Sequence, residues 1–346
     1  MENKKVEKKK VAIALQGGGA HGAFAWGVAD KLLEDGRFDI LGVSGTSAGG
    51  MNAAAIVQGL IKGGTEAARA TLRDYWREMS ELSKKISPFS LNPADKKAKY
   101  YNLDHSLGYL MMGQLQEHFS PYDLNPSNKN PFGDFVKNFF DYSAIRNSSE
   151  RKIFLGTTHV KTGKVKIFSN KDFHPDVLMA SACLPFMFQA VQVDGEDYWD
   201  GGFIANPAIF PLILDCDCSD VIVVQVTKTY REELPKTRAE IVDRLKEITY
   251  NGCMVHEMRA IHFISRMIDE GKVKDGEMKR INMHMIKNED SFKGLNLSSA
   301  LNTDWDFLMM LHNEGRKTAE KWINDHYEKV GTKVHTLDEG MFKDFV

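Results

Sequence analysis

The chain has 346 residues, of which 42% are hydrophobic and 27% charged, so it can bury a full core and is neither disordered nor fibrous. Its 45 basic and 47 acidic residues nearly cancel, which gives no global field for nucleic acid or for an anionic membrane. No apolar run approaches the roughly 18 residues of a spanning helix, so we expect no transmembrane segment. Four cysteines and no secretory signal at the start predict a cytoplasmic location, with at most peripheral membrane association.

The first part of the chain predicts two strand-to-helix units. After a basic tail over residues 1–10, which we expect to be flexible, Val11 to Leu15 form an apolar run that predicts a strand. A glycine-rich loop follows, and the next helix is expected to end near Gly36. Ile40 to Val43 predict a second strand, which leads into Gly45-Thr46-Ser47-Ala48-Gly49. Two such units in succession imply a parallel sheet covered by helices, an α/β fold.

The pattern changes between residues 80 and 149, where hydrophobic periodicity is broken and loop-forming residues are frequent. We interpret this segment as an insertion over the core. It is either a lid that offers four apolar residues to a ligand, or a peripheral helical layer whose apolar residues face the core. The hydrophobic pattern does not decide between these two interpretations. The four apolar residues are Tyr109, Leu110, Met111 and Met112.

Beyond residue 150 the chain predicts more strands and then mostly helix. Four short strands form two pairs around glycine turns: Lys152 to Thr158, Lys164 to Ser169, Gln189 to Val193 and Tyr198-Trp199. A short helix is expected over Asp176 to Leu184, and Val221 to Val226 predict a buried strand. A helix, an edge strand and a last helix follow: Thr237 to Glu270, Ile281 to Ile286 and Trp305 to Tyr327.

Cys216 and Cys218 flank Asp217, but no second Cys/His pair lies at zinc-ligand spacing. We interpret the two cysteines as packing thiols and predict no metal site.

Three stretches carry candidate chemistry. Residues 17–22, Gly-Gly-Gly-Ala-His-Gly, place N–H groups without side chains at the mouth of a helix, where they can converge on an anion. Residues 45–49 have the pattern of a nucleophile elbow, in which a tight turn between strand and helix exposes the hydroxyl of Ser47. A serine hydroxyl needs a base to take its proton, and Asp200 in Trp199-Asp200-Gly201-Gly202 is the candidate.

Taken alone, each stretch has a plainer interpretation. The glycine loop also fits a dinucleotide fingerprint with Asp39 as the ribose ligand. Asp39, however, precedes the strand that leads to Ser47 instead of ending it, which disfavours nucleotide binding. The serine pentapeptide could be an ordinary glycine-rich turn, and Asp200-Gly201-Gly202 could be a simple turn as well.

Together and in this order, the three stretches resemble the patatin-like phospholipase family, the lipid acyl hydrolases related to cytosolic phospholipase A2. The resemblance runs from about Val11 to Pro207 and includes residues 180–185 before the Asp200 turn and Asn206-Pro207 after it. It implies a three-layer α/β/α fold with a mainly parallel central sheet. The implied catalytic domain is 11–228, with the insertion or lid at 80–149, and residues 229–346 form a mostly helical C-terminal extension.

The resemblance implies a phospholipase A or lysophospholipase that cleaves carboxylic esters with a Ser-Asp dyad. Ser47 would attack the carbonyl and Asp200 would act as base, while the N–H groups of Gly17, Gly18 and Gly19 would form the oxyanion hole. It implies no metal or other cofactor. The expected partner is a lipid substrate at a membrane surface, and not nucleic acid.

One position departs from the family pattern. The family usually carries Arg or Lys just before the last glycine of the loop, and here His21 takes that place. A mostly neutral histidine would hold a substrate phosphate less firmly, unless His21 merely caps the helix or packs locally.

Two alternatives to the dyad remain. One is a Ser-Asp-His esterase that uses His256 or His262, although only about 40 residues precede Ser47, few for an α/β-hydrolase. The other is a catalytically idle lipid- or protein-binding module on the same fold.

Overall fold

The computed structural model describes residues 7–274 and 276–337. Of the predicted basic tail, residues 1–6 lie outside this range, whereas Lys9 and Lys10 already belong to the first strand. The Lys9 ammonium donates to the carbonyl oxygens of Tyr327 and Val330 at 2.7 and 2.8 Å. These bonds tie the start of the sheet to the end of the last helix.

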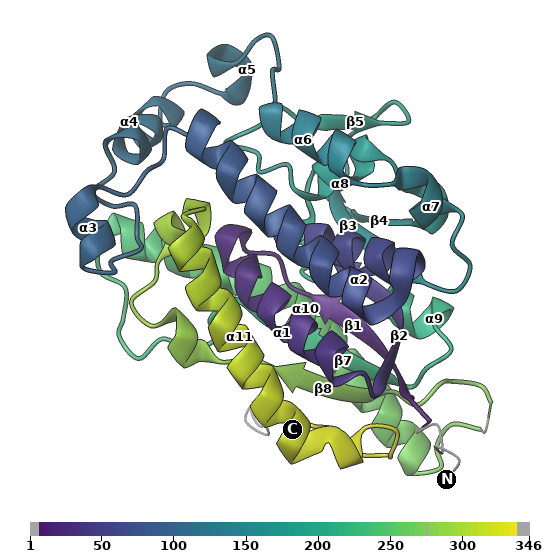
Figure 1. The fold of residues 1–346 in the computed structure, drawn as a ribbon. Coiled ribbons are helices and arrows are strands. Elements are labelled where there is room, and N and C mark those ends of the chain that lie inside the picture. Colours follow the sequence, from purple (N-terminus) through teal and green to yellow (C-terminus); the bar gives the residue numbers. More distant parts are fainter. Residues whose placement is uncertain (1–6, 275, 338–346) are drawn as a thin grey trace.

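Within the described residues, eight strands form one mixed sheet (Figure 1). Their bounds are β1 Lys9–Leu15, β2 Phe38–Gly45, β3 Lys152–His159, β4 Val165–Ser169, β5 Val191–Val193, β6 Glu196–Asp200, β7 Asp220–Val224 and β8 Asn282–Ile286. The order is β5-β6-β3-β2-β1-β7-β8, and β4 pairs with β3. The run β3-β2-β1-β7-β8 is parallel throughout, while β4, β5 and β6 pair antiparallel. The predicted mainly parallel sheet is confirmed.

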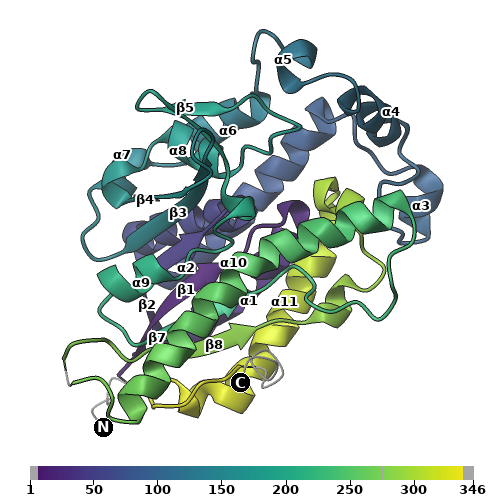
Figure 2. The same cartoon turned by 180° about the vertical axis from the view of Figure 1, so that it is seen from behind.

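The eleven helices of the described chain surround this sheet. Their bounds are α1 Gly22–Asp35, α2 Ala48–Ile86, α3 Pro93–Lys97, α4 Leu107–Gln116, α5 Pro121–Leu124, α6 Pro131–Phe139, α7 Tyr142–Arg146, α8 Pro175–Ser181, α9 Phe210–Asp215, α10 Arg238–Asp269 and α11 Trp305–His326. Helices α1, α2 and α11 cover one face (Figure 1), and α9 and α10 cover the other (Figure 2). This is the predicted three-layer α/β/α arrangement.

Strand β1 contributes side chains to both hydrophobic cores, one on each face of the sheet. Its residues alternate: Val11, Ile13 and Leu15 pack with α1, α2 and α11, and Ala12 and Ala14 face the core under α9 and α10. Because successive side chains of a strand point to opposite faces, a strand buried on both sides reads as a continuous apolar run. The second core also contains Cys216 and Cys218, the predicted packing thiols.

The C-terminal part of the chain completes the layers. Strand β8 is the edge strand next to β7, as predicted, and α11 packs along α1. Two glycines allow the close approach of these helices, since a Cβ at Gly27 would overlap the His312 carbonyl and one at Gly315 would overlap the Phe24 carbonyl. No helix in the described ranges is long and apolar enough to cross a membrane.

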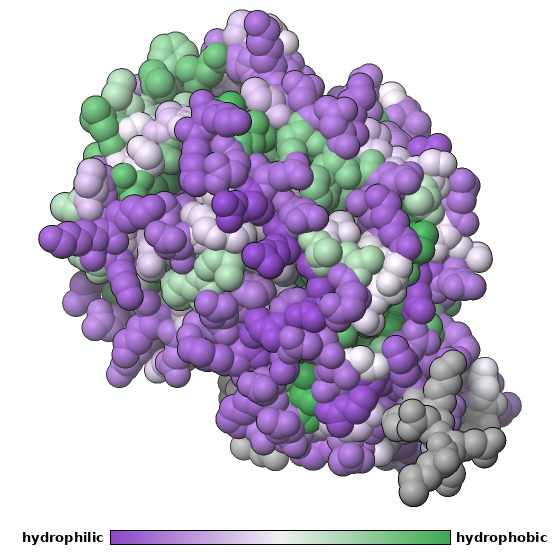
Figure 3. Space-filling model, viewed as in Figure 1, coloured by the Kyte–Doolittle hydropathy of each residue, from purple (hydrophilic) through white to green (hydrophobic). Residues whose placement is uncertain are grey.

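The predicted insertion gives a mixed outcome. Residues 80–86 are the last turns of α2, and α6 and α7 pack against that helix. Helix α4 buries none of its residues, and Leu110 and Met111 are exposed. Leu110 and Met111 therefore do not face the core, Tyr109 and Met112 are half-buried, and none of the four lines the cavity described below. Figure 3 shows hydrophobic residues exposed at the upper left, over α4.

Candidate active site

The serine of the pentapeptide lies at a strained turn between β2 and α2. Ser47 has φ 56° and ψ −126°, a backbone conformation that L-residues rarely adopt. No larger residue fits at the two flanking glycines, because a Cβ at Gly45 would overlap the Gly49 carbonyl and one at Gly49 would overlap the Leu15 carbonyl. The turn leaves Ser47 partly exposed at the N-terminus of α2. This is the geometry of a nucleophile elbow.

A second serine holds this turn in place. The Ser47 amide donates to the Ser181 carbonyl oxygen at 2.9 Å and also lies 3.2 Å from Ser181 Oγ, which donates to the Gly156 carbonyl. Ser181 is the last residue of α8, so this helix ends three residues before the predicted end at Leu184. Its final carbonyl group is turned toward the elbow. Ser181 falls within residues 180–185, part of the resemblance to the family, but nothing in its sequence context indicates this role.

Asp200 ends strand β6 and is fully buried. Its Oδ1 accepts the Gly202 amide at 2.7 Å, whereas Oδ2 has no hydrogen-bond partner among the described residues. Burial raises the pKa of Asp200 to about 6, and the Gly202 amide, the Ser47 hydroxyl and the charge of Lys246 each oppose part of that shift. The Ser47 hydroxyl thus lies close enough to the carboxylate to oppose the rise of its pKa, while Oδ2 keeps no hydrogen-bond partner among the described residues.

The glycine loop approaches the elbow directly. A Cβ at Gly17 would lie 2.9 Å from Ser47 Cβ. The Gly17 amide, however, donates to Asn206 Oδ1 at 2.6 Å, and Asn206 Nδ2 returns a bond to the Gly17 carbonyl at 3.3 Å. Gly17 is buried, but Gly18 and Gly19 are accessible, and in the described chain no acceptor takes up their N–H groups. Asn206 thus already occupies the amide of Gly17, and within the predicted donor set Gly18 and Gly19 are the members whose N–H groups have no acceptor in the described chain.

Gln16 anchors the loop from the other side. Its Oε1 accepts the amides of Val226 and Thr227, both at 2.9 Å, and its Nε2 donates to Asn251 Oδ1 at 2.9 Å. Gln16 is completely buried, so these bonds satisfy an amide that would otherwise be costly to bury. They connect the ends of β1 and β7 with α10.

His21, in the glycine loop, is a packed, neutral side chain. Its Nε2 is 2.8 Å from Ser299 Oγ, and its ring contacts the rings of Phe292 and Phe307. Burial lowers the pKa of His21 to about 3, helped by the charges of Lys246 and Lys228. A neutral histidine carries no positive charge at this position, and its contacts are those of a locally packed side chain.

An apolar cavity of about 340 Å³ opens beside Ser47. Gly19 and Ser47 are part of its lining. Most of its wall is made of large apolar and aromatic side chains from α2, α6 and later loops: Met51, Tyr75, Trp76, Met79, Phe132, Phe188 and Leu301. Such a lining suits a hydrocarbon chain. We call it the apolar cavity.

The two histidines of the alternative triad lie elsewhere. His256 is exposed on α10. His262 lies further along the same helix, with its ring centroid 5.4 Å from that of His335, and it lines a different hollow together with residues of α11. In the described part of the chain, the lining of the apolar cavity contains no histidine.

The mainly parallel sheet between helical layers defines a three-layer α/β/α protein. It brings together Ser47 at a strained turn, the buried Asp200 and the accessible amides of the glycine loop. The family model of the patatin-like phospholipases matches residues 13–213, which is more than half of the chain. The chain belongs to this family, a family of lipid hydrolases. No curated protein matches the chain significantly.

Several solved structures are similar to this chain. VipD from Legionella pneumophila shares 16% identity at a TM-score of 0.36, over 89% of this chain and 67% of VipD. The ExoU-SpcU complex from the type III secretion system of Pseudomonas aeruginosa contains a chain with 17% identity at a TM-score of 0.32, over 97% of this chain and 57% of that one. The present chain thus spans little more than half the length of the second relative.

Proposed function

We propose that the chain is a serine lipid acyl hydrolase of the phospholipase A or lysophospholipase type, with Ser47 as nucleophile and Asp200 as base. The observation that carries the proposal is the pairing of a strained, partly exposed Ser47 with a buried carboxylate whose Oδ2 has no partner among the described residues. A free carboxylate oxygen next to a serine hydroxyl can accept its proton. With a pKa of about 6, Asp200 is ionised at neutral pH and is a stronger base than an exposed aspartate.

The reaction then follows from these positions. Ser47 Oγ attacks the ester carbonyl carbon and its proton passes to Asp200 Oδ2. The N–H groups of Gly18 and Gly19 stabilise the tetrahedral oxyanion. When this intermediate collapses, the alcohol leaves with the proton held by Asp200, and the acyl group remains on Ser47. Water attacks the acyl-enzyme with Asp200 again as base, which releases the fatty acid and restores the hydroxyl.

The apolar cavity supports a lipid acyl substrate over a small polar ester. Its lining contains Ser47 and Gly19 together with aromatic and aliphatic side chains of α2, including Trp76 and Met79. An acyl chain in this space would place its carbonyl carbon at the serine. The exposed apolar residues of α4 would contact the lipid surface from which the substrate is taken.

Release of fatty acid from phospholipid vesicles tests this function. Wild type is compared with Ser47→Ala and Asp200→Asn, and the matched control variants are His256→Ala and His262→Ala. We expect each dyad substitution to lower the rate on the order of a thousandfold or more, while the histidine variants keep the wild-type rate. Equal acyl release by wild type and Ser47→Ala would refute the proposal, and loss of activity in either histidine variant would favour a triad.

A further inference from the structure

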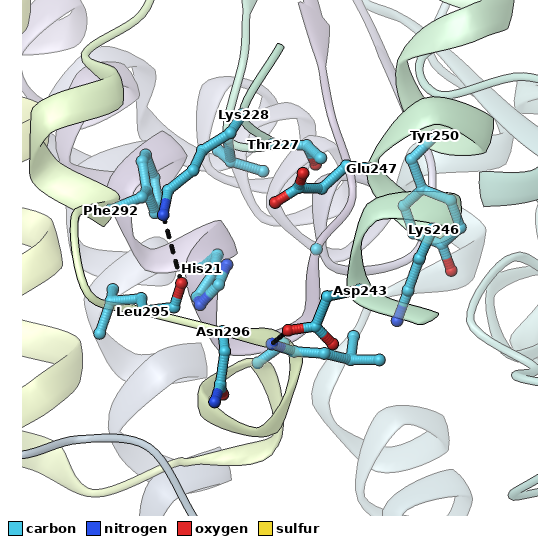
Figure 4. Close-up of a pocket in the computed structure, with 14 residues that line it drawn as sticks. His21, Thr227, Lys228, Asp243, Lys246, Glu247, Tyr250, Phe292, Leu295 and Asn296 are labelled. Carbon is cyan, nitrogen blue, oxygen red and sulfur yellow. Dashed lines mark hydrogen bonds between the residues drawn. The ribbon is translucent and has the colours of Figure 1, made fainter. Parts of the chain in front are cut away.

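A second, smaller pocket adjoins the glycine loop (Figure 4). Its volume is about 60 Å³, enough for several water molecules or for one group of phosphate size. Gly18 lines this pocket and Gly19 lines the apolar cavity, while Ala300 borders both. The two spaces therefore meet at the loop beside Ser47. We call the smaller one the polar pocket.

Two lysines lie in the wall of the polar pocket. Figure 4 shows Lys228 and Lys246 on opposite sides of it, with the His21 ring on the Lys228 side. The Lys228 ammonium donates to the Leu295 carbonyl at 3.3 Å. The Lys246 ammonium lies 5.0 Å from the centroid of the Tyr250 ring, and it forms no salt bridge with any carboxylate of the described residues.

The acidic residues of this pocket are engaged elsewhere. Glu247 pairs with Arg231 at 2.8 Å and with Arg244 at 3.2 Å. Asp243 accepts the Leu297 amide at 3.3 Å and attracts Lys246 only from a distance. Glu247 is neutralised by its two arginines, while Asp243 and the buried Asp200 both attract Lys246 from a distance. The polar pocket thus offers an ammonium group, that of Lys246, which no carboxylate of the described residues holds in a salt bridge.

Tyr250 adds a neutral donor to the same place. Its side chain is only 4% exposed, and its hydroxyl has no hydrogen-bond partner in the described structure. The ring packs on Gly202, where a Cβ would come within 2.8 Å of it. A buried hydroxyl without a partner is costly unless a ligand or water satisfies it. Tyr250 and Lys246 thus both line the polar pocket, and neither side chain has a hydrogen-bond acceptor among the described residues.

We propose that the polar pocket binds the phosphate group of a phospholipid headgroup, with Lys246 as the cation that determines this specificity. Lys228 and the Tyr250 hydroxyl assist it. The proposal rests on the proposed function, because the acyl chain must occupy the apolar cavity when the phosphate occupies this pocket. Lys246 and Lys228 lie beyond the segment 13–213 that matches the family, so the C-terminal half supplies the cation that His21 does not.

Paired substrates test the role of Lys246. Phosphatidylcholine and diacylglycerol with identical acyl chains are compared in mixed micelles of a neutral detergent, at the pH plateau of each variant. For Lys246→Met we expect kcat/KM on phosphatidylcholine to fall about 10- to 100-fold and that on diacylglycerol to change less than threefold. Lys246→Arg keeps the charge and should retain most of the preference. Lys164→Met, at an exposed lysine in the β3–β4 hairpin, is the matched control.

Two outcomes of these assays overturn the proposal. An equal loss on both substrates would mean that Lys246 acts on Asp200 and not on a headgroup. No change on either substrate would mean that it does not contact the substrate. Thermal unfolding of each variant ensures that the comparison is made on folded protein. If Lys246→Met does not fold, Lys246→Gln, which also removes the charge, provides the same test with the same expected loss on phosphatidylcholine.

A binding experiment separates this proposal from the proposed function. Glycerophosphocholine and inorganic phosphate are titrated into Ser47→Ala and into Ser47→Ala/Lys246→Met. We expect glycerophosphocholine to bind the first variant and to lose at least tenfold in affinity for the second. Binding of inorganic phosphate alone would indicate a free-anion site and overturn the headgroup assignment. Lys246-dependent binding by a protein without esterase activity would uphold the pocket while the proposed function fails.

Discussion

The amide of Gly17 lies 2.6 Å from Asn206 Oδ1, and this bond fixes the glycine loop to the chain just after Asp200. Asn206 is completely buried and bonds both polar groups of Gly17, its N–H and its carbonyl. Gly17 is thereby a fixed point, and the accessible N–H groups of Gly18 and Gly19 lie next to it. A single side chain thus couples the loop that carries the proposed oxyanion donors to the segment that carries the proposed base.

Substitution of Asn206 by Ala is expected to impair stability and turnover together. Removing the amide leaves the Gly17 N–H buried without a partner, which costs about 1–3 kcal/mol of unfolding free energy. Because the loop then loses its fixed point, kcat for ester hydrolysis should fall at least tenfold. The control is Asn170→Ala, which removes a buried amide that accepts the Ile153 N–H at 2.9 Å, far from the loop. Comparable kcat losses in both variants would contradict the coupling.

Asp200→Asn should abolish activity and stabilise the fold at neutral pH. The pKa of Asp200 is about 6 in the folded protein and near 3.8 when unfolded, so ionisation above pH 6 opposes folding. Asparagine keeps the Gly202 contact without the charge and should add on the order of 3 kcal/mol at pH 8. The gain should shrink as pH falls through 6 and vanish below 4. Urea unfolding at several pH values checks this, and a variant less stable at pH 8 would be incompatible with it.

His21→Gln should make the protein less sensitive to acid. The pKa of His21 is about 3 in the folded protein and near 6.5 when unfolded, so the neutral ring contributes stability above pH 6.5 that is lost as pH falls toward 3. Glutamine can still reach Ser299 but does not titrate. Relative to this variant, wild type should lose up to about 1.4 kcal/mol per pH unit below 6.5. If the unfolding free energies of wild type and His21→Gln depended on pH in the same way, His21 would not be buried in its neutral form.

Met79→Trp is expected to shorten the apolar cavity. A larger side chain at this position of its wall leaves less room for a long acyl chain, while a short ester still reaches Ser47. The ratio of kcat/KM for p-nitrophenyl palmitate to that for p-nitrophenyl acetate should fall about tenfold. Met278→Trp, at an exposed methionine, serves as the control. An unchanged ratio in Met79→Trp would place the acyl chain elsewhere.

Local patterns in the sequence predict most of the fold. The apolar runs predict β1, β2 and β7 because buried parallel strands read as continuous hydrophobic stretches, and the Thr237 cap predicts the start of α10 within one residue. The tight turn around Ser47 is predictable because a side chain at Gly45 or Gly49 would overlap nearby backbone atoms, either in the turn itself or at the end of β1. The exposure of α4 is not predictable, since an apolar helix reads the same whether it packs on protein or contacts solvent.

The parts of the site that the sequence did not predict depend on long-range contacts. Asn206 and Ser181 lie in segments that match the family, yet nothing local indicates that their partners are Gly17 and Ser47. Lys246 is one of many charged residues on an amphipathic helix, and only the fold brings it to Gly18. The occupation of the Gly17 amide follows from the same long-range packing, which is why all three glycines were predicted as donors.

Covalent labelling with a fluorophosphonate, followed by peptide mass spectrometry, tests the central claim most directly. The probe phosphonylates a serine that a neighbouring base activates, so labelling reports on the nucleophile without any choice of lipid substrate. We predict one adduct, on Ser47, which forms at least a hundredfold more slowly in Asp200→Asn and at the wild-type rate in His256→Ala and His262→Ala. A folded protein that forms no adduct, or forms it on another serine, would contradict the account.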